Sequence, residues 1–118
     1  YLTRALDRDP EYINIVNNLG VVCANQGRMD EAERYFERAL GLNPNNAGTL
    51  NNLGQLAMDR GRYESAEKYL RKALDIDHGN IQALKNLGEV LVKLGNQAEA
   101  DGVFKRTQAL ENNHGRLR

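Results

Sequence analysis

The sequence contains few of the residues from which catalytic and metal sites are built. It has one cysteine and two histidines, so no internal disulfide can form and no metal-ligand spacing occurs. No Gly-Lys-Ser or Gly-Lys-Thr marks a phosphate-binding loop. Acidic pairs such as Asp30–Glu31 fall at expected helix ends, where solvation explains them. We therefore expect a chain that is not an enzyme and needs no cofactor and no metal.

A predominance of one charge is also absent. Lys plus Arg and Asp plus Glu each number 16, and the formal net charge is +0. A nucleic-acid-binding domain usually carries a basic face, and none is evident. No apolar run is long enough for a membrane span, and the first residues do not form a signal peptide. Neither nucleic acid nor a membrane is expected as a partner.

An internal repeat dominates what the sequence does contain. The tripeptide Asn-Leu-Gly occurs at residues 18–20, 52–54 and 86–88, an interval of 34 residues. A constant period of this kind is the signature of a stacked repeat protein. With positions counted from residues 13, 47 and 81, every copy has Leu at position 7, Gly at positions 8 and 15, and Ala at position 20.

The apolar residues of each copy predict two antiparallel helices. They recur at positions 4, 7, 8 and 11, and again at 20, 24, 27 and 28, which is the spacing of one helix face. In the third copy Thr107 and Gln108 replace the Ala-Leu pair at positions 27 and 28. Gly at position 15 separates the two stripes, because helix ends commonly need a left-handed residue. Gly at position 8 and Ala at position 20 lack bulk, so the helices can cross closely; in the middle copy Leu53 and Ala66 are expected in that core. The expected helix starts lie near Ile13, Met29, Ala47, Arg62, Ile81 and Gln97.

This pattern resembles the tetratricopeptide repeat family, which has the same period. The resemblance covers nearly the whole chain as a single domain, 1–118. It implies an all-α fold, a right-handed α-solenoid of antiparallel helix pairs with about seven helices, the first truncated. The expected parts are the end of a preceding repeat at 1–12, full repeats at 13–46, 47–80 and 81–114, and a tail at 115–118.

The two ends of the chain depart from the pattern. Leu2, Ala5, Leu6 and Pro10 fit positions 24, 27, 28 and 32 of the preceding repeat. Because the chain lacks an initial Met and begins within a helix, we interpret it as a fragment of a longer protein.

Residues near the end of the third repeat predict a weak last helix. Gly102 falls in mid-helix, which costs about 1 kcal/mol relative to Ala. At the end of the second and third repeats, His78 and Asn112 replace the expected proline. The two histidines of the chain, His78 and His114, are both predicted to lie in turns.

The single cysteine, Cys23, occupies position 11 of the first repeat, in the apolar stripe. We interpret it as a small buried side chain in a reducing compartment such as the cytoplasm. The alternative is a reactive thiol, and neither interpretation identifies the compartment.

In the family, the first helix of each repeat lines a concave surface through positions 2, 5, 6, 9, 12 and 13. The resemblance therefore implies a groove that binds a protein or peptide segment. An extended peptide presents backbone donors and acceptors, which Asn and Gln side chains match. The candidate binding residues are Asn14, Asn17, Asn18, Val21, Asn51, Asn52, Gln55, Asp59, Lys85, Asn86, Glu89 and Lys93.

These candidates do not all predict the same role. The position-6 residues Asn18, Asn52 and Asn86 form a ladder similar to that in the superhelical region of the O-linked N-acetylglucosamine transferases. The alternative is a local hydrogen bond between helices, which we favour for any single one of them. Positions 5 and 9 are less constrained by packing, so their side chains are expected to be solvated and open to a ligand. Lys85 and Glu89 supply a charged point, or alternatively pair with each other one helical turn apart.

A second comparison within the family concerns acidic ligands. Members that bind the acidic C-termini of chaperones carry Lys or Arg with Asn at positions 5, 6 and 9, and Asn52 and Lys85 match that set. Asn17 replaces a lysine, Val21 an asparagine and Glu89 a cation, so a carboxylate would meet a negative charge. The resemblance therefore does not predict binding of chaperone tails.

The leading interpretation is a non-catalytic interaction or scaffold module that binds a peptide or protein segment in the groove. The first alternative is a structural module that associates weakly with copies of itself through its repeat ends. The second is the regulatory or substrate-binding arm of a larger enzyme, such as a glycosyltransferase, whose chemistry lies outside residues 1–118.

Overall fold

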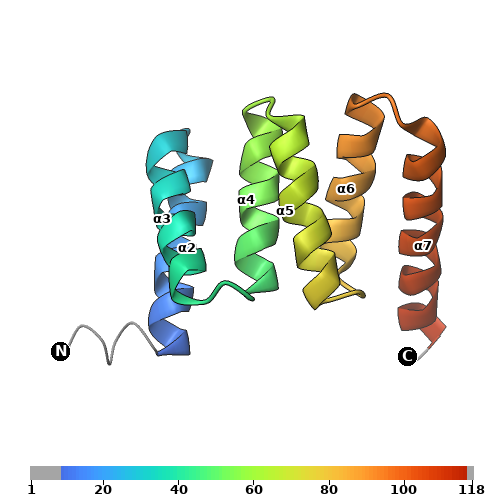
Figure 1. Ribbon diagram of the computed structural model, residues 1–118. Coiled ribbons are helices and arrows are strands. Elements are labelled where there is room, and N and C mark those ends of the chain that lie inside the picture. Colours follow the sequence, from blue (N-terminus) through green and yellow to red (C-terminus); the bar gives the residue numbers. More distant parts are fainter. Residues whose placement is uncertain (1–8, 117–118) are drawn as a thin grey trace.

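The computed structural model describes residues 9–116, and this part of the chain consists of helices joined by short turns, without a strand. The predicted all-α solenoid of helix pairs is confirmed. The helices are α2 (Pro10–Asn25), α3 (Met29–Leu42), α4 (Ala47–Asp59), α5 (Tyr63–Ile76), α6 (Ile81–Lys93) and α7 (Gln97–Arg116). They stand side by side in a row, with α2 and α3 at one end and α7 at the other (Figure 1). The expected helical character of Leu2, Ala5 and Leu6 lies outside the described residues.

Five helices begin within one residue of their predicted starts, and α2 begins three residues early. Asp9 caps α2, accepting a hydrogen bond from the Glu11 amide at 2.9 Å, and Pro10 is its first residue. An Asp N-cap followed by Pro is a favoured helix start, because proline has no N–H to leave unpaired. The first helix therefore begins before the predicted start at Ile13, and the assignment of residues 1–12 to a preceding repeat stays a prediction.

The glycine between the two helices of each repeat has the predicted left-handed conformation. The φ angles of Gly27, Gly61 and Gly95 are 79°, 75° and 84°. In the first repeat the Arg28 amide donates to the Cys23 carbonyl at 2.8 Å, and the Gly27 amide donates to the Ala24 carbonyl at 3.0 Å. This pair of bonds is the Schellman motif, which satisfies the last carbonyls of the helix and turns the chain back on itself.

Within each repeat the two helices cross closely at a glycine, as predicted. A Cβ atom added to Gly54 would lie 2.7 Å from Leu70 Cδ2, and one added to Gly20 would lie 2.5 Å from Phe36 Cε1. The position-20 alanines that face this crossing are fully buried, and Leu53 is 2% exposed in the middle repeat. The predicted register of the helix pairs is therefore confirmed.

Equivalent positions are not equally buried at the ends of the row. Leu19 is 42% exposed and Phe104 is 37% exposed, although Leu53 and Leu70 hold the same positions in the middle repeat and are buried. Both belong to the predicted apolar stripes of their helices, at positions 7 and 24 of the repeat. They are exposed because, within the described residues, neither end has a further helix packed against it.

The C-terminal helix differs from the prediction in its length. It continues to Arg116, so Asn112 and His114 are helical and the predicted turn at these residues is wrong. Neither a proline nor a left-handed glycine is present there to stop the helix. His78 does lie in a turn, as predicted. The expected weakness of α7 around Gly102 stays a prediction.

Amide side chains join the first helices of successive repeats. Asn52 Nδ2 donates to Asn17 Oδ1, and Asn86 Nδ2 donates to Asn51 Oδ1, both at 3.1 Å. Asn86 is only 3% exposed, and its own Oδ1 accepts from Gln82 at 3.3 Å. The ladder therefore runs from position 6 of one repeat to position 5 of the repeat before it, and it holds α2, α4 and α6 in line.

Ion pairs join successive repeats on the side of the second helices. Arg60 reaches back to Asp30 at 2.8 Å, and Arg71 reaches forward to Glu99 at 2.8 Å. The hydrogen bond to Glu99 is the main cause of a raised pKa for the Arg71 guanidinium. Each repeat boundary is therefore crossed both by an amide hydrogen bond and by an ion pair.

The helix crossing predicts opposite outcomes for two glycine-to-alanine substitutions. In Gly54→Ala the new methyl group meets buried Leu70, and overpacking of this kind costs about 1–3 kcal/mol, more than the gain in helix propensity. In Gly102→Ala the new methyl group meets nothing within 4 Å, so the gain of about 1 kcal/mol is kept. Urea denaturation should show a less stable Gly54→Ala and a more stable Gly102→Ala. The packing assignment is wrong if Gly54→Ala is the more stable of the two.

The amide ladder predicts a coupling between Asn51 and Asn86. Asn51→Ala leaves the buried Asn86 amide without its acceptor, which should lower the free energy of unfolding by about 1–3 kcal/mol. A double-mutant cycle with Asn86→Ala should give a coupling of about 0.5–1.5 kcal/mol. Asn18→Ala is the matched control. It removes the same group from the exposed position 6 of α2 and should change stability by less than about 0.5 kcal/mol. Additive effects in the cycle would contradict the ladder.

Candidate functional site

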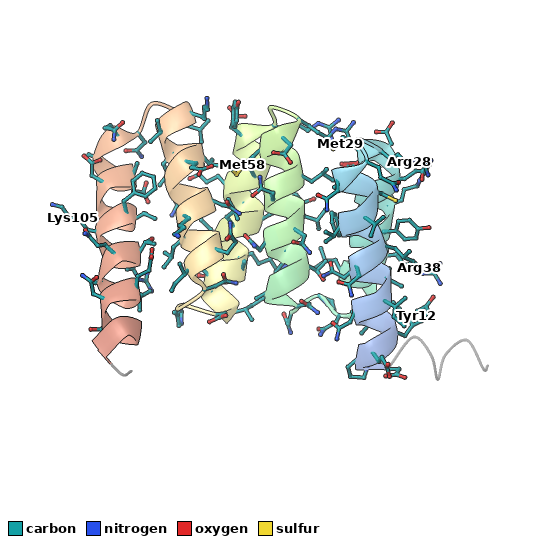
Figure 2. The ribbon with its side chains drawn as sticks, turned by 180° about the vertical axis from the view of Figure 1, so that it is seen from behind. Tyr12, Arg28, Met29, Arg38, Met58 and Lys105 are labelled. Carbon is teal, nitrogen blue, oxygen red and sulfur yellow. The ribbon has the colours of Figure 1, made fainter. Side chains whose placement is uncertain are left out.

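The candidate binding residues lie on the face formed by α2, α4 and α6, here called the first-helix face. Helix α2 contacts α4, and α4 contacts α6, so the three first helices form one surface. Figure 2 views the molecule from this side, with Met58 near one end of α4. The face is produced by the glycine crossings, which place the second helices behind it. Its side chains therefore come from three consecutive repeats.

A pocket of about 120 Å³ opens on this face between α2 and α4. It brings together four of the predicted residues, and it also contains residues that the sequence did not single out. Phe36 and Leu56 are both 2% exposed and supply its apolar base, while the rim is half-buried or exposed. Its lining consists of Val21, Ala24, Asn25, Phe36, Asn52, Gln55, Leu56 and Asp59.

The asparagines at positions 5 and 6 are largely engaged with one another. Asn17, Asn51 and Asn52 are half-buried and hydrogen-bonded across the repeat boundaries. The expectation that position-5 side chains are solvated is therefore wrong for Asn17 and Asn51, because each is the acceptor for the next repeat. At position 6, Asn52 and Asn86 each make the hydrogen bond between helices that was the alternative to ligand binding. Their contact with a ligand stays a prediction.

Gln55, Asp59 and Glu89 remain available on the face. Gln55 is half-buried and donates to exposed Asp59 at 3.2 Å, one turn along the same helix. Glu89 is exposed, and no cation among the side chains of residues 9–113 lies within ion-pair distance of it. Exposed Lys93 holds the same repeat position as Asp59, one repeat further along. The exposed residues Asn14 and Asn18 lie on α2, away from the pocket.

Lys85 pairs across two helices instead of along one. Its Nζ lies 3.4 Å from Glu111 Oε1 on α7, so the alternative of a Lys85–Glu89 pair is not the one adopted. Glu111 was not predicted at the site, because the repeat pattern placed it next to a turn. The only sequence feature that could have indicated this contact is the absence, directly after residue 111, of a proline or glycine that would end the helix. The result is that the positive charge of Lys85 is neutralised within the chain.

A larger hollow of about 580 Å³ lies beside the first-helix face at its α6–α7 end. Lys85 and Glu89 border it together with α7 residues that include exposed Phe104 and Glu111. This hollow is wide, and the cation that borders it, Lys85, is already paired with Glu111. It is therefore less suited to specific recognition of a ligand than the pocket between α2 and α4.

In the part of the chain that the structure describes, no cluster of three His, Cys, Asp or Glu residues is suited to hold a metal ion. Cys23 is buried, with its Sγ 3.9 Å from Glu31 Oε2. None of the described helices is long and apolar enough to cross a membrane.

Many solved structures share this fold, among them three tetratricopeptide repeat or related proteins. The tetratricopeptide repeat domain of Arabidopsis OM64 has a TM-score of 0.82 and 23% identity, over 86% of this chain and 84% of that one. The second such domain of Spaghetti (RPAP3), bound to the HSP90 peptide SRMEEVD, has a TM-score of 0.80 and 22% identity, over 83% and 91%. MamA has a TM-score of 0.83 and 23% identity, over 88% and 61%.

The solved structures are only 22–23% identical to this chain and show its fold, whereas a match to a family model shows its family. No curated protein matches the chain. The model described as "Tetratricopeptide repeat" matches residues 11–77 and again 45–111, each match spanning two successive repeats. Together with the repeated glycine crossings, this shows that the chain belongs to the tetratricopeptide repeat family.

Proposed function

We propose that this chain is a non-catalytic interaction module that binds an extended segment of another protein across the first-helix face. The observation that carries the proposal is the pocket between α2 and α4, which gathers Val21, Asn52, Gln55 and Asp59 from two repeats. The second tetratricopeptide repeat domain of RPAP3, which has a similar fold, is bound to an HSP90 peptide, and this supports a peptide as the kind of ligand.

The chemistry of the face suits the backbone of an extended segment. Gln55 offers both a donor and an acceptor, and its only intramolecular partner within the described residues is exposed Asp59 on the same helix. Breaking a bond between exposed groups one turn apart costs a few tenths of a kcal/mol. Gln55 can therefore exchange that bond for one to a ligand at little cost, unlike Asn51, whose acceptor is needed by buried Asn86.

The charges of the face argue against an acidic ligand such as SRMEEVD. Glu89 is exposed and unpaired within the described side chains, and Asp59 borders the pocket. Lys85 could attract a carboxylate, but Glu111 already pairs with it at 3.4 Å. At the pocket an acidic segment would therefore meet Asp59, and none of the lining residues is a cation. Exposed Lys93 lies one repeat further along, one helical turn from Glu89, so the proposed ligand is not an acidic tail.

The proposal is tested by Gln55→Ala. Peptides selected from a displayed random library against the whole chain should bind this variant about two- to tenfold more weakly, because one hydrogen bond to the ligand is lost. The melting temperature should barely change. Gln97→Ala is the matched control, since Gln97 also donates to an aspartate one turn along its helix, at 2.8 Å, but lies on α7. Equal affinity of the selected peptides for Gln55→Ala and the wild type would refute binding at this face.

A second candidate function, assembly through repeat ends, is supported by an apolar stripe on α2. Ile15, Leu19 and Val22 are 52%, 42% and 50% exposed and follow one another at helical spacing. The same positions are buried in α4 and α6, where a second helix of the preceding repeat covers them. At the opposite end of the row Phe104 is also exposed. A second copy stacked head to tail would cover both surfaces.

Assembly is tested by Leu19→Lys in sedimentation experiments on the whole chain. The wild type should associate with rising concentration, and Leu19→Lys should suppress this, because a charge cannot be buried at the junction without a partner. Ile76→Lys is the control, since Ile76 is similarly exposed, at 40%, but ends α5 in the middle of the row. A wild type that stays monomeric at high concentration would eliminate this candidate.

A further inference from the structure

The pocket between α2 and α4 exists because two side chains in the first repeat are short. Val21 and Ala24 border it on α2. The same positions in the second repeat hold Gln55 and Met58, and Met58 packs against the core of that part of the row. The hollow is thus a property of one repeat boundary and not of the repeat pattern. A ligand would meet a specific socket there.

The size and base of the pocket fit one aliphatic side chain. The volume is about 120 Å³, and the base is formed by buried Phe36 and Leu56. An engineered apolar cavity of about 150 Å³ holds benzene, so this smaller space suits a group of the size of the valine or leucine side chain. Burial of such a group, which removes apolar surface from water, would supply a large share of the affinity for a short segment.

The rim of the pocket carries one charge that is not neutralised. Asp59 is exposed, and its only side-chain partner within the described residues is neutral Gln55. The nearby cation Arg60 is directed to Asp30 and Glu33 of the preceding repeat, at 2.8 and 3.7 Å. The rim facing Asp59 from α2 is formed by uncharged side chains, Val21, Ala24 and Asn25. A cation on the ligand would find a carboxylate beside the socket.

We propose that the first-helix face selects a segment that places an aliphatic side chain in this pocket and a lysine or arginine next to it, against Asp59. The inference rests on the proposed function and specifies its ligand. The aliphatic group supplies affinity through burial, and the adjacent cation supplies selectivity through charge complementarity at the rim.

The socket is tested with Ala24→Met, which copies the residue at the same position of the second repeat. The probes are the peptides selected from a displayed random library against the wild-type chain. Filling the pocket should weaken their binding by about tenfold or more, which corresponds to the loss of one buried aliphatic group. Ala98→Met makes the same change at an exposed site on α7 and should leave affinity unchanged. Melting temperatures of both variants should stay near that of the wild type, because Ala and Met have similar helix propensities.

The charged contact is tested with Asp59→Asn and with peptides in which the basic residue is replaced by glutamine. Asp59→Asn should weaken binding of the original peptides about two- to fivefold, in line with an exposed ion pair, and should not affect the glutamine peptides. Asp75→Asn, an exposed carboxylate on α5, is the matched control and should have no effect.

Three outcomes separate this inference from the proposed function. Selected peptides that share an aliphatic residue beside Lys or Arg, and that lose affinity with Ala24→Met and Asp59→Asn, support both. Peptides that lose affinity with Gln55→Ala but carry aromatic or uncharged polar residues in place of that pair overturn the inference and leave the proposed function standing. Acidic peptides would overturn both, because the proposed ligand is not acidic. Failure to select any peptide, or binding that none of these variants changes, overturns both.

Discussion

The close approach of each helix pair at a glycine is the constraint on which the rest of the structure depends. Buried Leu70 lies where a side chain on Gly54 would be, and Phe36 and Phe104 lie in the same way against the glycines of the other repeats. This contact sets the distance and angle between the two helices of a repeat. It thereby fixes which sides of α2, α4 and α6 face away from the second helices, and so creates the face on which the amide ladder and the pocket lie.

The fold was predictable from the sequence because its determinants are local and repeated. Left-handed glycines such as Gly61 and the apolar stripes occur at the same place in every copy, so three copies give the same prediction. The errors arose where the copies are not equivalent. Pro10 follows a capping Asp, so it begins a helix although Pro44, at the same position one repeat later, lies in a turn.

The candidate site was predictable as a face but not as a set of contacts. Position in the repeat identified Val21 and Gln55, because the resemblance to the tetratricopeptide repeat family implies which positions of the first helix line the concave surface. Whether an asparagine side chain is free for a ligand or hydrogen-bonded to the next repeat depends on the distance between the two repeats, which cannot be read from the sequence. The importance of Ala24 was also hidden, because an empty space is defined by side chains from two repeats at once. Glu111 reached Lys85 only because α7 continues past the expected turn.

The main helix contacts in the row join elements that are neighbours, or next but one, along the chain. Long loops therefore do not have to close before native contacts form, and the contact order is low. Proteins of this kind fold fast, and their folding can start in any repeat and spread to the next. The middle repeat, α4 with α5, is the place where spreading in both directions is possible. The cooperativity of unfolding along the row is then set by how strongly each boundary, through its amide hydrogen bond and its ion pair, couples one repeat to the next.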